Sequence, residues 1–214
     1  MSLFIGQHGA SNTNRCLPSD SRLPGRRGCA WPNLLLVILT ALVYMICPLA
    51  LRGQSEVDEY RLKAAFLFHF AQFVEWPSNP AKAPDGGFIF CVVGEDPFHG
   101  DLEGTVQGKS VSGKTIRVRH IKQPQDTKEC DVVFVDRNQS GRIREFIAAV
   151  SDGPVLTVGD SDDFLRQGGM IRFCTEDRKV RFEVNQEAAE KANLKVSSRL
   201  LLLAKSVIGR SGGR

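Results

Sequence analysis

DVVFVDRNQSGRIREFIAAVSDGPVLTVGD, residues 131–160, carries the pattern that decides the fold. Its two ends, DVVFVD (131–136) and GPVLTVGD (153–160), are short continuous apolar runs, which are typical of strands buried on both faces. Between them, SGRIREFIAAV (140–150) has the apolar spacing of an amphipathic helix, with Ser140 as its expected cap. A strand, a helix and a second strand in this order predict a parallel pair of strands joined by a helical crossover.

Earlier segments continue this alternation. FIFCVVG (88–94) is another buried apolar run and precedes a short predicted helix, PFHGDLEGTV (97–106). KTIRVRHI (114–121) alternates polar and apolar residues, as a half-exposed strand does. SDDFLRQ (161–167) is expected to form a short capped helix that Gly168 and Gly169 close.

The pattern changes near the end of the chain. MIRFCTE (170–176) and KVRFEVN (179–185) alternate on either side of the polar pair Asp177-Arg178, which predicts an antiparallel hairpin. NQEAAEKAN (185–193) and VSSRLLLLAKSVIG (196–209) predict two final helices, the first capped by Asn185. The predicted fold is therefore α/β, with a mostly parallel sheet flanked by helices, a C-terminal antiparallel hairpin and two C-terminal helices.

A long aromatic helix precedes the sheet. Apolar residues recur at helical spacing over about four turns, and the last turn reaches Trp76-Pro77, where proline ends the helix. This face comprises Tyr60, Ala64, Leu67, Phe68, Ala71 and Val74.

Phe66, Phe70 and Phe73 form a second stripe beside this face. One interpretation is a central helix that is covered on both sides. The other is that part of the aromatic stripe lies at an exposed surface that binds a partner.

Basic charge is concentrated at the N-terminus. Residues 1–53 hold five arginines and one acid, 5 − 1 = +4, whereas the remaining residues hold 23 basic and 23 acidic side chains. A neutral body argues against nucleic acid as a partner, because phosphate binding needs a basic face. Arginines followed by the uncharged run LLLVILTALVYMICPLAL (34–51) indicate an export signal or a retained membrane anchor over residues 1–53. The folded domain is expected over 54–208, with a disordered tail over 209–214.

Export would place the body in an oxidising compartment, where cysteines pair. Cys91, Cys130 and Cys174 lie outside the leader, so one disulfide and one free thiol are expected. Cys91 lies inside a buried strand and Cys130 immediately precedes another, and neighbouring strands could bring them together. The disulfide would be structural or, alternatively, a redox sensor.

The sequence contains no catalytic motif, and we predict neither catalytic residues, a metal site nor a cofactor. His69, His99 and His120 are scattered and have no Cys-x-x-Cys beside them. Two polar loops follow strands, where α/β folds place ligands. They contribute Glu95 and Asp96, and Asp160 and Ser161, as candidate ligand residues, although Asp160 and Ser161 also fit a helix cap and turn.

KAAFLFHFAQFVEWP, FCVVGEDPF and the block from VGDSDDFLRQGG to LLLLAKSV resemble the YfiR family of exported bacterial proteins over about residues 56–208. The resemblance implies a periplasmic α/β protein without catalytic activity that forms dimers. It also implies binding to the periplasmic sensor region of an inner-membrane diguanylate cyclase. Cys91 and Cys130 match one family disulfide, whereas Cys174 lies near a second whose other cysteine is missing here.

The expected function is therefore regulatory. The protein would bind the periplasmic part of an inner-membrane signalling protein, a diguanylate cyclase or a sensor kinase, and restrain cyclic-di-GMP signalling. Phe66, Phe70 and Phe73 are the candidate partner-binding residues. The alternative is a periplasmic protein that binds a small ligand at the two polar loops.

Overall fold

The computed structural model describes residues 58–77 and 86–209, all within the compact unit Ile46–Arg214. The predicted leader lies outside these residues, as does the predicted tail apart from Gly209. No helix in the described segments is long and apolar enough to cross a bilayer.

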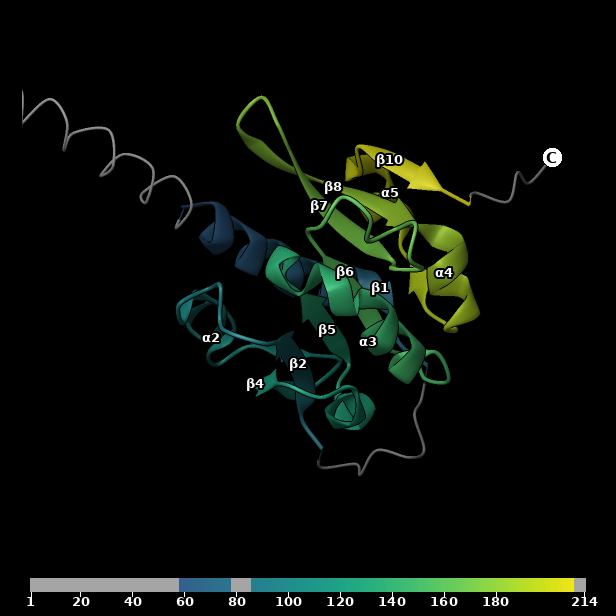
Figure 1. Cartoon of the computed structure of the whole chain (residues 1–214). Helices are drawn as coiled ribbons and strands as arrows, with labels where there is room; N and C mark the ends of the chain where they lie inside the picture. The colour runs from purple at the N-terminus through teal and green to yellow at the C-terminus, as the bar shows by residue number, and fades with distance from the viewer. Residues whose placement is uncertain (1–57, 78–85, 210–214) are drawn as a thin grey trace, which may run out of the picture. The chain divides into compact units, whose positions relative to one another are not determined.

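A sheet of eight strands forms the centre of the described segments (Figure 1). The strand order is β10-β8-β7-β6-β5-β2-β4-β3. Five neighbouring strands of the sheet, β7, β6, β5, β2 and β4, are parallel to one another. β7 and β8 form the predicted antiparallel hairpin, and β10 pairs with β8 in parallel. The mostly parallel α/β fold is thus confirmed. The strands are β2 (Phe88–Val93), β3 (Ser110–Val111), β4 (Lys114–Ile121), β5 (Val132–Val135), β6 (Leu156–Gly159), β7 (Ile171–Glu176), β8 (Lys179–Asn185) and β10 (Ser206–Ile208).

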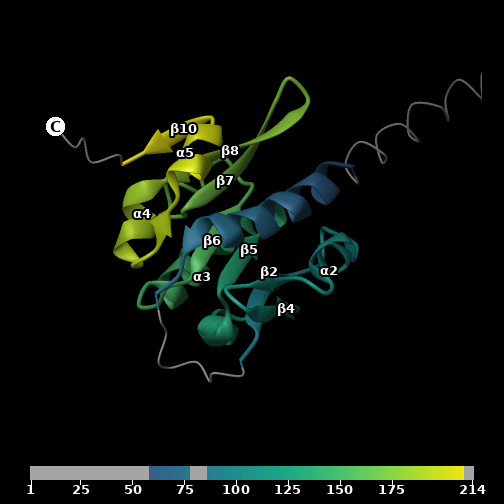
Figure 2. The ribbon, with the colours of Figure 1, turned by 180° about the vertical axis from the view of Figure 1, so that it is seen from behind.

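The aromatic helix covers one face of the sheet and α3 (Ile143–Val150) covers the other (Figures 1 and 2). The aromatic helix is helical over residues 58–73. Successive residues of a strand point to opposite faces, so Phe90 of β2 packs in the core beneath the aromatic helix and Cys91 packs in the core beneath α3. Because both faces of the sheet are covered, the central strands β2 and β5 are apolar throughout instead of alternating.

The chain after the aromatic helix turns into a short strand. β1 (Val74–Glu75) pairs antiparallel with β9 (Lys195–Val196), and the backbone N–H of Ser197 donates to the carbonyl of Phe73 at 2.9 Å. These bonds tie the end of the aromatic helix to the C-terminal part of the chain.

The aromatic helix ends at residue 73 and not at Trp76-Pro77, and three other local predictions are also wrong. Asp136, not Ser140, caps the helical segment before α3, since its carboxylate accepts from the backbone N–H of Asn138. Residues 162–168 form turns and not a helix. The last helix ends at Leu203, after which the chain becomes β10, so the predicted single helix over 196–209 does not form. The remaining helical elements are α2 (Asp101–Val106), η1 (Pro124–Glu129), η2 (Arg137–Arg142), α4 (Gln186–Lys191) and α5 (Ser198–Leu203).

Candidate functional site

The strand order creates a topological switch point. The chain leaves β2 for β4 on one side of the sheet and leaves β5 for β6 on the other side. β2 and β5 are neighbours, and in open α/β sheets ligands bind outside the carboxyl ends of such strands.

A cavity of about 730 Å³ lies at this switch point. Its lining comes from the ends of three parallel strands: Glu95 and Asp96 after β2, Lys122 after β4, and Asp136 after β5. Arg142 of η2 adds a second cation. This cavity, the switch-point cavity, combines carboxylates and cations in a volume that suits a small polar molecule. Ligand binding by Glu95 and Asp96 stays a prediction.

Lys63 is a buried cation on the aromatic helix. Only 1% of the residue is exposed, and its Nζ lies 2.7 Å from a carboxylate oxygen of Glu59 and 2.7 Å from one of Asp160. The Asp160 side chain is also 1% exposed. The ammonium group lies 4.1 Å from the centre of the Tyr60 ring, close enough for a cation–π contact. A buried lysine is rare unless it is paired, so this ion pair is a specific feature of the site.

Tyr60 joins the ends of β5 and β6. Its hydroxyl donates to Asp136 at 2.6 Å and lies 3.0 Å from Asp160. Burial and the hydrogen bond to Asp136 raise the pKa of the Tyr60 hydroxyl far above its usual value, so the group stays protonated. Burial alone would lower the pKa of Arg137, but the Asp160 carboxylate, with Tyr60 and Glu59, raises it overall.

A second cavity of about 720 Å³ lies beside this ion pair. Asp160 and Ser161 line it with four cations, which are Lys63, Arg137, Arg172 and Lys205. Oδ1 of Asp160 and Oγ of Ser161 are shielded from solvent and have no hydrogen-bond partner in the part of the chain that the structure describes. The two predicted ligand loops therefore line different cavities. The interpretation of Asp160 as a cap is wrong, because its carboxylate pairs with Lys63.

Sequence analysis missed Lys63 although a signal was present. Lys63 lies three residues after Tyr60 and four before Leu67, so helical spacing already places it on the buried face. Its partner Asp160 is 97 residues away and comes close only through the parallel pairing of the strands.

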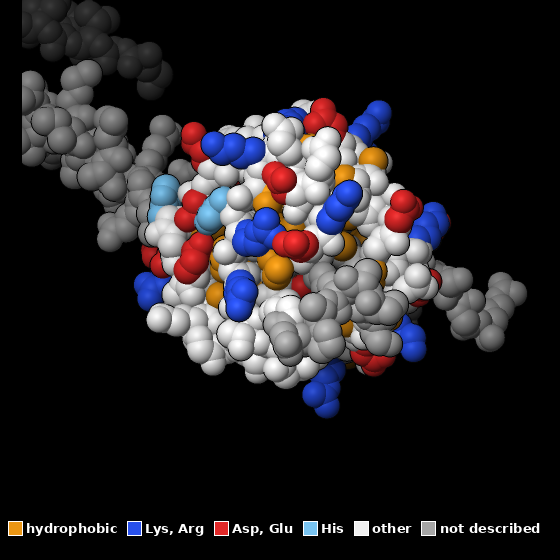
Figure 3. Space-filling model, turned by 90° about the horizontal axis from the view of Figure 1, so that it is seen from below, with side chains coloured by type: hydrophobic (Ala, Val, Ile, Leu, Met, Phe, Trp, Pro, Cys, Tyr) orange, Lys and Arg blue, Asp and Glu red, His pale blue; other side chains and the backbone are white. Residues whose placement is uncertain are grey.

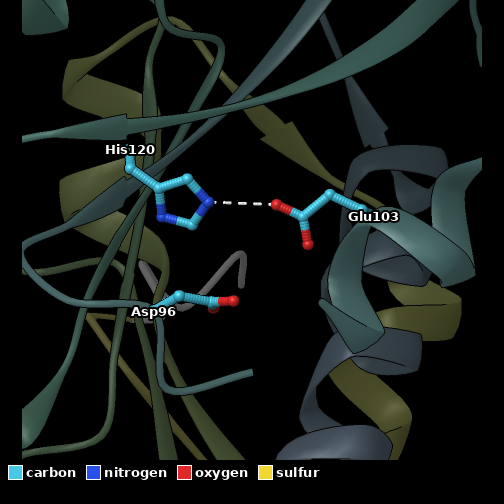
Figure 4. A group of neighbouring side chains, drawn as sticks. All are labelled: Asp96, Glu103 and His120. Atoms are coloured by element: carbon cyan, nitrogen blue, oxygen red, sulfur yellow. Dashed lines mark hydrogen bonds and ion pairs between the residues drawn. The ribbon is translucent and has the colours of Figure 1, made fainter. Parts of the chain in front are cut away.

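One histidine is not isolated. His120 of β4 lies beside Glu103 of α2 and Asp96 of the loop after β2 (Figure 4). The face shown in Figure 3 likewise has histidine side chains next to acidic ones, with lysine, arginine and carboxylate groups interspersed. His120 thus has two acidic neighbours that its sequence context did not indicate.

Cys91 and Cys130 are joined by a disulfide, and both residues are 1% exposed. It lies in the core beneath α3. Cys174 on β7 is a free thiol. Burial raises its pKa, and the negative charge of Glu183 raises it further. A raised pKa lowers the thiolate fraction, which makes Cys174 a poor nucleophile.

The aromatic stripe divides between core and surface. Phe70 is 0% exposed, and its ring lies 5.4 Å from that of Phe173 and 4.9 Å from that of Phe182. The expectation that Phe70 is exposed for partner binding is wrong, because the hairpin β7–β8 covers it. Phe66 and Phe73 are half-buried, so their contribution to a partner surface stays a prediction.

Large apolar side chains are exposed at the other end of the sheet. Leu202 and Leu203 of α5 are 85% and 64% exposed, and Ile208 of β10 is 50% exposed. α5 and β10 lie side by side (Figures 1 and 2). No strand of the described segments pairs with the outer edge of β10. We call these three residues with this edge the C-terminal apolar edge.

Comparison with solved structures gives distant similarities. A conserved domain protein from Vibrio cholerae O1 biovar El Tor is 12% identical, with a TM-score of 0.45, over 56% of this chain and 54% of that chain. The ABC domain from Streptococcus pneumonia, solved in complex with L-Trp, is also 12% identical, with a TM-score of 0.45, over 58% of this chain and 56% of that chain. The chain thus spans little more than half the length of each.

Comparison with protein families is more specific. A family model described as YfiR/HmsC-like, a domain of unknown function, matches residues 60–205. The matched range contains the entire sheet except for β10, and it contains the lining residues of both cavities except Glu59. The chain therefore belongs to the YfiR/HmsC-like family, whose role at the level of the family is periplasmic regulation of cyclic-di-GMP signalling.

Proposed function

We propose that this protein is a non-catalytic periplasmic regulator that binds the periplasmic part of an inner-membrane signalling protein, such as a diguanylate cyclase, and restrains cyclic-di-GMP signalling. Family membership supports the signalling role. The leader over residues 1–53 would direct export or anchor the chain to the inner membrane, where such a partner is located.

The C-terminal apolar edge is the observation that carries the proposed contact. Exposed leucines next to each other are unfavourable in water, and contiguous apolar surface marks interaction sites. The outer edge of β10 also presents backbone groups that a strand from a partner can pair with. The edge therefore offers both apolar burial and backbone hydrogen bonds to a partner.

The test is complementation of a deletion strain with the full chain. Wild-type protein is expected to lower cellular cyclic-di-GMP relative to the deletion. The double variant Leu202→Asp/Leu203→Asp is expected to lose this effect and crosslinking to the cyclase, because desolvating two carboxylates in the contact weakens binding tenfold or more, roughly the cost of losing a hot spot. Immunoblotting of the periplasmic fraction checks that the variant accumulates.

Leu62→Asp is the matched control. Leu62 is 46% exposed on the aromatic helix, so the same chemical change is made on a different surface. If Leu62→Asp abolishes regulation and the double variant does not, the partner binds the aromatic helix near Phe66 and Phe73 and not the C-terminal apolar edge. An unchanged cyclic-di-GMP level in the deletion strain would contradict the regulatory proposal itself.

The predicted homodimer is a separate proposal for the same edge. Light scattering of the purified full chain measures the mass of the particle in solution. A dimer that Leu202→Asp/Leu203→Asp converts to a monomer would show that two copies meet at the C-terminal apolar edge. A dimer unaffected by both substitutions would place the dimer contact elsewhere and leave the edge free for the signalling partner.

The switch-point cavity favours a second candidate function, which is binding of a small polar ligand. A ligand that binds only the native state raises the melting temperature, so a thermal-shift screen of polar metabolites tests this function. Arg142→Ala should abolish the shift for a ligand of the switch-point cavity, whereas Lys205→Ala, in the second cavity, should leave it unchanged. The opposite result would assign the ligand to the second cavity.

A further inference from the structure

Asp96, Glu103 and His120 come from three different elements and converge on one point. One potential ligand atom from each lies within 4.8 Å of the other two. Figure 4 shows the three side chains directed toward the same space, with Nε2 of His120 3.0 Å from Oε1 of Glu103. The loop after β2, helix α2 and strand β4 each supply one ligand, so the cluster is fixed by tertiary structure and not by a sequence motif.

The other oxygen of Glu103 gives an independent indication that a ligand is missing. Oε2 of Glu103 is shielded from solvent and has no hydrogen-bond partner in residues 58–77 and 86–209. The Glu103 side chain as a whole is 43% exposed, but an oxygen that is shielded from water and lacks a partner still calls for an explanation. A cation beside Glu103 would satisfy it.

Asp96 is oriented in advance. Its two carboxylate oxygens accept from the backbone N–H groups of Phe98 and Gly100, both at 2.8 Å. These bonds hold the carboxylate in place, and each oxygen keeps a further lone pair for another partner. Asp96 therefore needs little reorganisation to coordinate an ion.

The charges of the cluster also favour a bound divalent cation over the same three side chains without an ion. The carboxylates of Asp96 and Glu103 repel each other at this separation. A divalent ion would offset both negative charges and also bind an imidazole lone pair of His120.

The ligand types select the class of metal. Imidazole nitrogen with carboxylate oxygen suits Zn²⁺ and other first-row transition metals, whereas Mg²⁺ and Ca²⁺ prefer oxygen alone. With metal–ligand distances of about 2.1 Å, two ligands of a tetrahedral ion lie roughly 3.4 Å apart. The ligand atoms, which lie at most 4.8 Å apart, would approach one another to about this separation when an ion binds.

We propose that Asp96, Glu103 and His120 form a binding site for a divalent transition metal, with Zn²⁺ as the ion to test. Three protein ligands leave one coordination position for water or another ligand. Because Asp96 also lines the switch-point cavity, the ion lies at the rim of that cavity. The proposal rests on the cluster alone and does not depend on the identity of the signalling partner.

The experiment is calorimetric titration of chelator-treated, purified full chain with ZnCl₂. We expect a class of sites with one ion per chain, and a rise in melting temperature on saturation, because the metal binds the native state. His120→Asn and Glu103→Gln should each weaken this binding more than about tenfold, since even loss of an outer hydrogen-bond partner of a metal ligand costs 10–100-fold. His69→Asn is the matched control, because His69 is exposed on the aromatic helix and lies outside the cluster.

Circular dichroism confirms that each variant is folded before titration. Visible absorption of bound Co²⁺ gives a second readout, since His120→Asn should change the spectrum if the imidazole is a ligand. The proposal is overturned if the wild-type chain binds no Zn²⁺. It is also overturned if Zn²⁺ affinity and the Co²⁺ spectrum are the same in wild type, His120→Asn and Glu103→Gln.

Discussion

Replacing Lys63 by methionine tests the buried ion pair most directly. Methionine keeps much of the length and apolar volume of the lysine side chain but removes its charge. The Asp160 side chain, which is 1% exposed, would lose its partner at 2.7 Å. It would keep only the Tyr60 hydroxyl at 3.0 Å and the half-exposed guanidinium of Arg137 at 3.4 Å. The substitution thus leaves a buried carboxylate incompletely compensated.

The magnitude follows from this residual compensation. Removing one partner of a buried ion pair costs about 3–5 kcal/mol of unfolding free energy, and the remaining contacts of Asp160 place Lys63→Met at the lower end, about 3 kcal/mol. For a domain of this size, each kcal/mol shifts the melting temperature by about 2–4 °C, so the expected decrease is about 6–12 °C. Thermal and urea unfolding of the full chain, followed by circular dichroism, measure both quantities.

A double variant separates charge from packing. Lys63→Met/Asp160→Asn removes both charges while keeping the shape of both side chains, so it should recover most of the lost stability. If Lys63→Met alone lowers the unfolding free energy by less than about 1 kcal/mol, the ion pair does not stabilise the fold as argued. If the double variant is as unstable as the single one, the loss comes from packing.

Three other predictions concern the disulfide, the free thiol and a helix cap. The disulfide joins Cys91 and Cys130, which are 39 residues apart, so by loop entropy its reduction should lower the unfolding free energy by about 4 kcal/mol. The melting temperature should fall by about 8–16 °C. Unfolding with and without reductant, in a Cys174→Ser background, measures both quantities. Persistence of the fold together with altered partner affinity after reduction would instead support redox sensing. Because burial raises the pKa of Cys174, iodoacetamide should alkylate Cys174 more slowly than free cysteine at pH 8, and the reaction should accelerate only at higher pH. Equal alkylation rates at pH 8 would contradict this. Asn185→Ala removes the bond from the Ala188 N–H to the Asn185 side chain at the start of α4 and should lower the unfolding free energy by about 1 kcal/mol, and no loss would show that this cap is dispensable.

Elements with strong local patterns were predictable from the sequence. The continuous apolar runs of β2, β5 and β6 identify strands buried on both faces, and the alternation around Asp177-Arg178 identifies the hairpin. Both turn residues have positive φ, 49° and 59°, which an aspartate tolerates better than most residues. Here local preference and tertiary packing agree.

Predictions failed where tertiary contacts override local spacing. The spacing of Leu200, Leu203 and Val207 fits a helix, but pairing with β8 makes Val207 part of a strand. Phe70 belongs to a stripe that, taken alone, also fits an exposed surface, and only the position of the hairpin against the helix buries it. Asp160 resembles a cap because its distant partner Lys63 is not visible locally.

By itself, the sequence determined the fold class, the family and the absence of a recognisable catalytic motif, because apolar periodicity and ordered blocks of residues are local properties. The tertiary structure alone decided which polar groups meet. Parallel strands bring their carboxyl ends to one edge, and this places Asp96 near Glu103 and His120, and Lys63 near Asp160. The proposed metal site and the buried ion pair therefore both depend on the strand order, since no short sequence motif contains their residues.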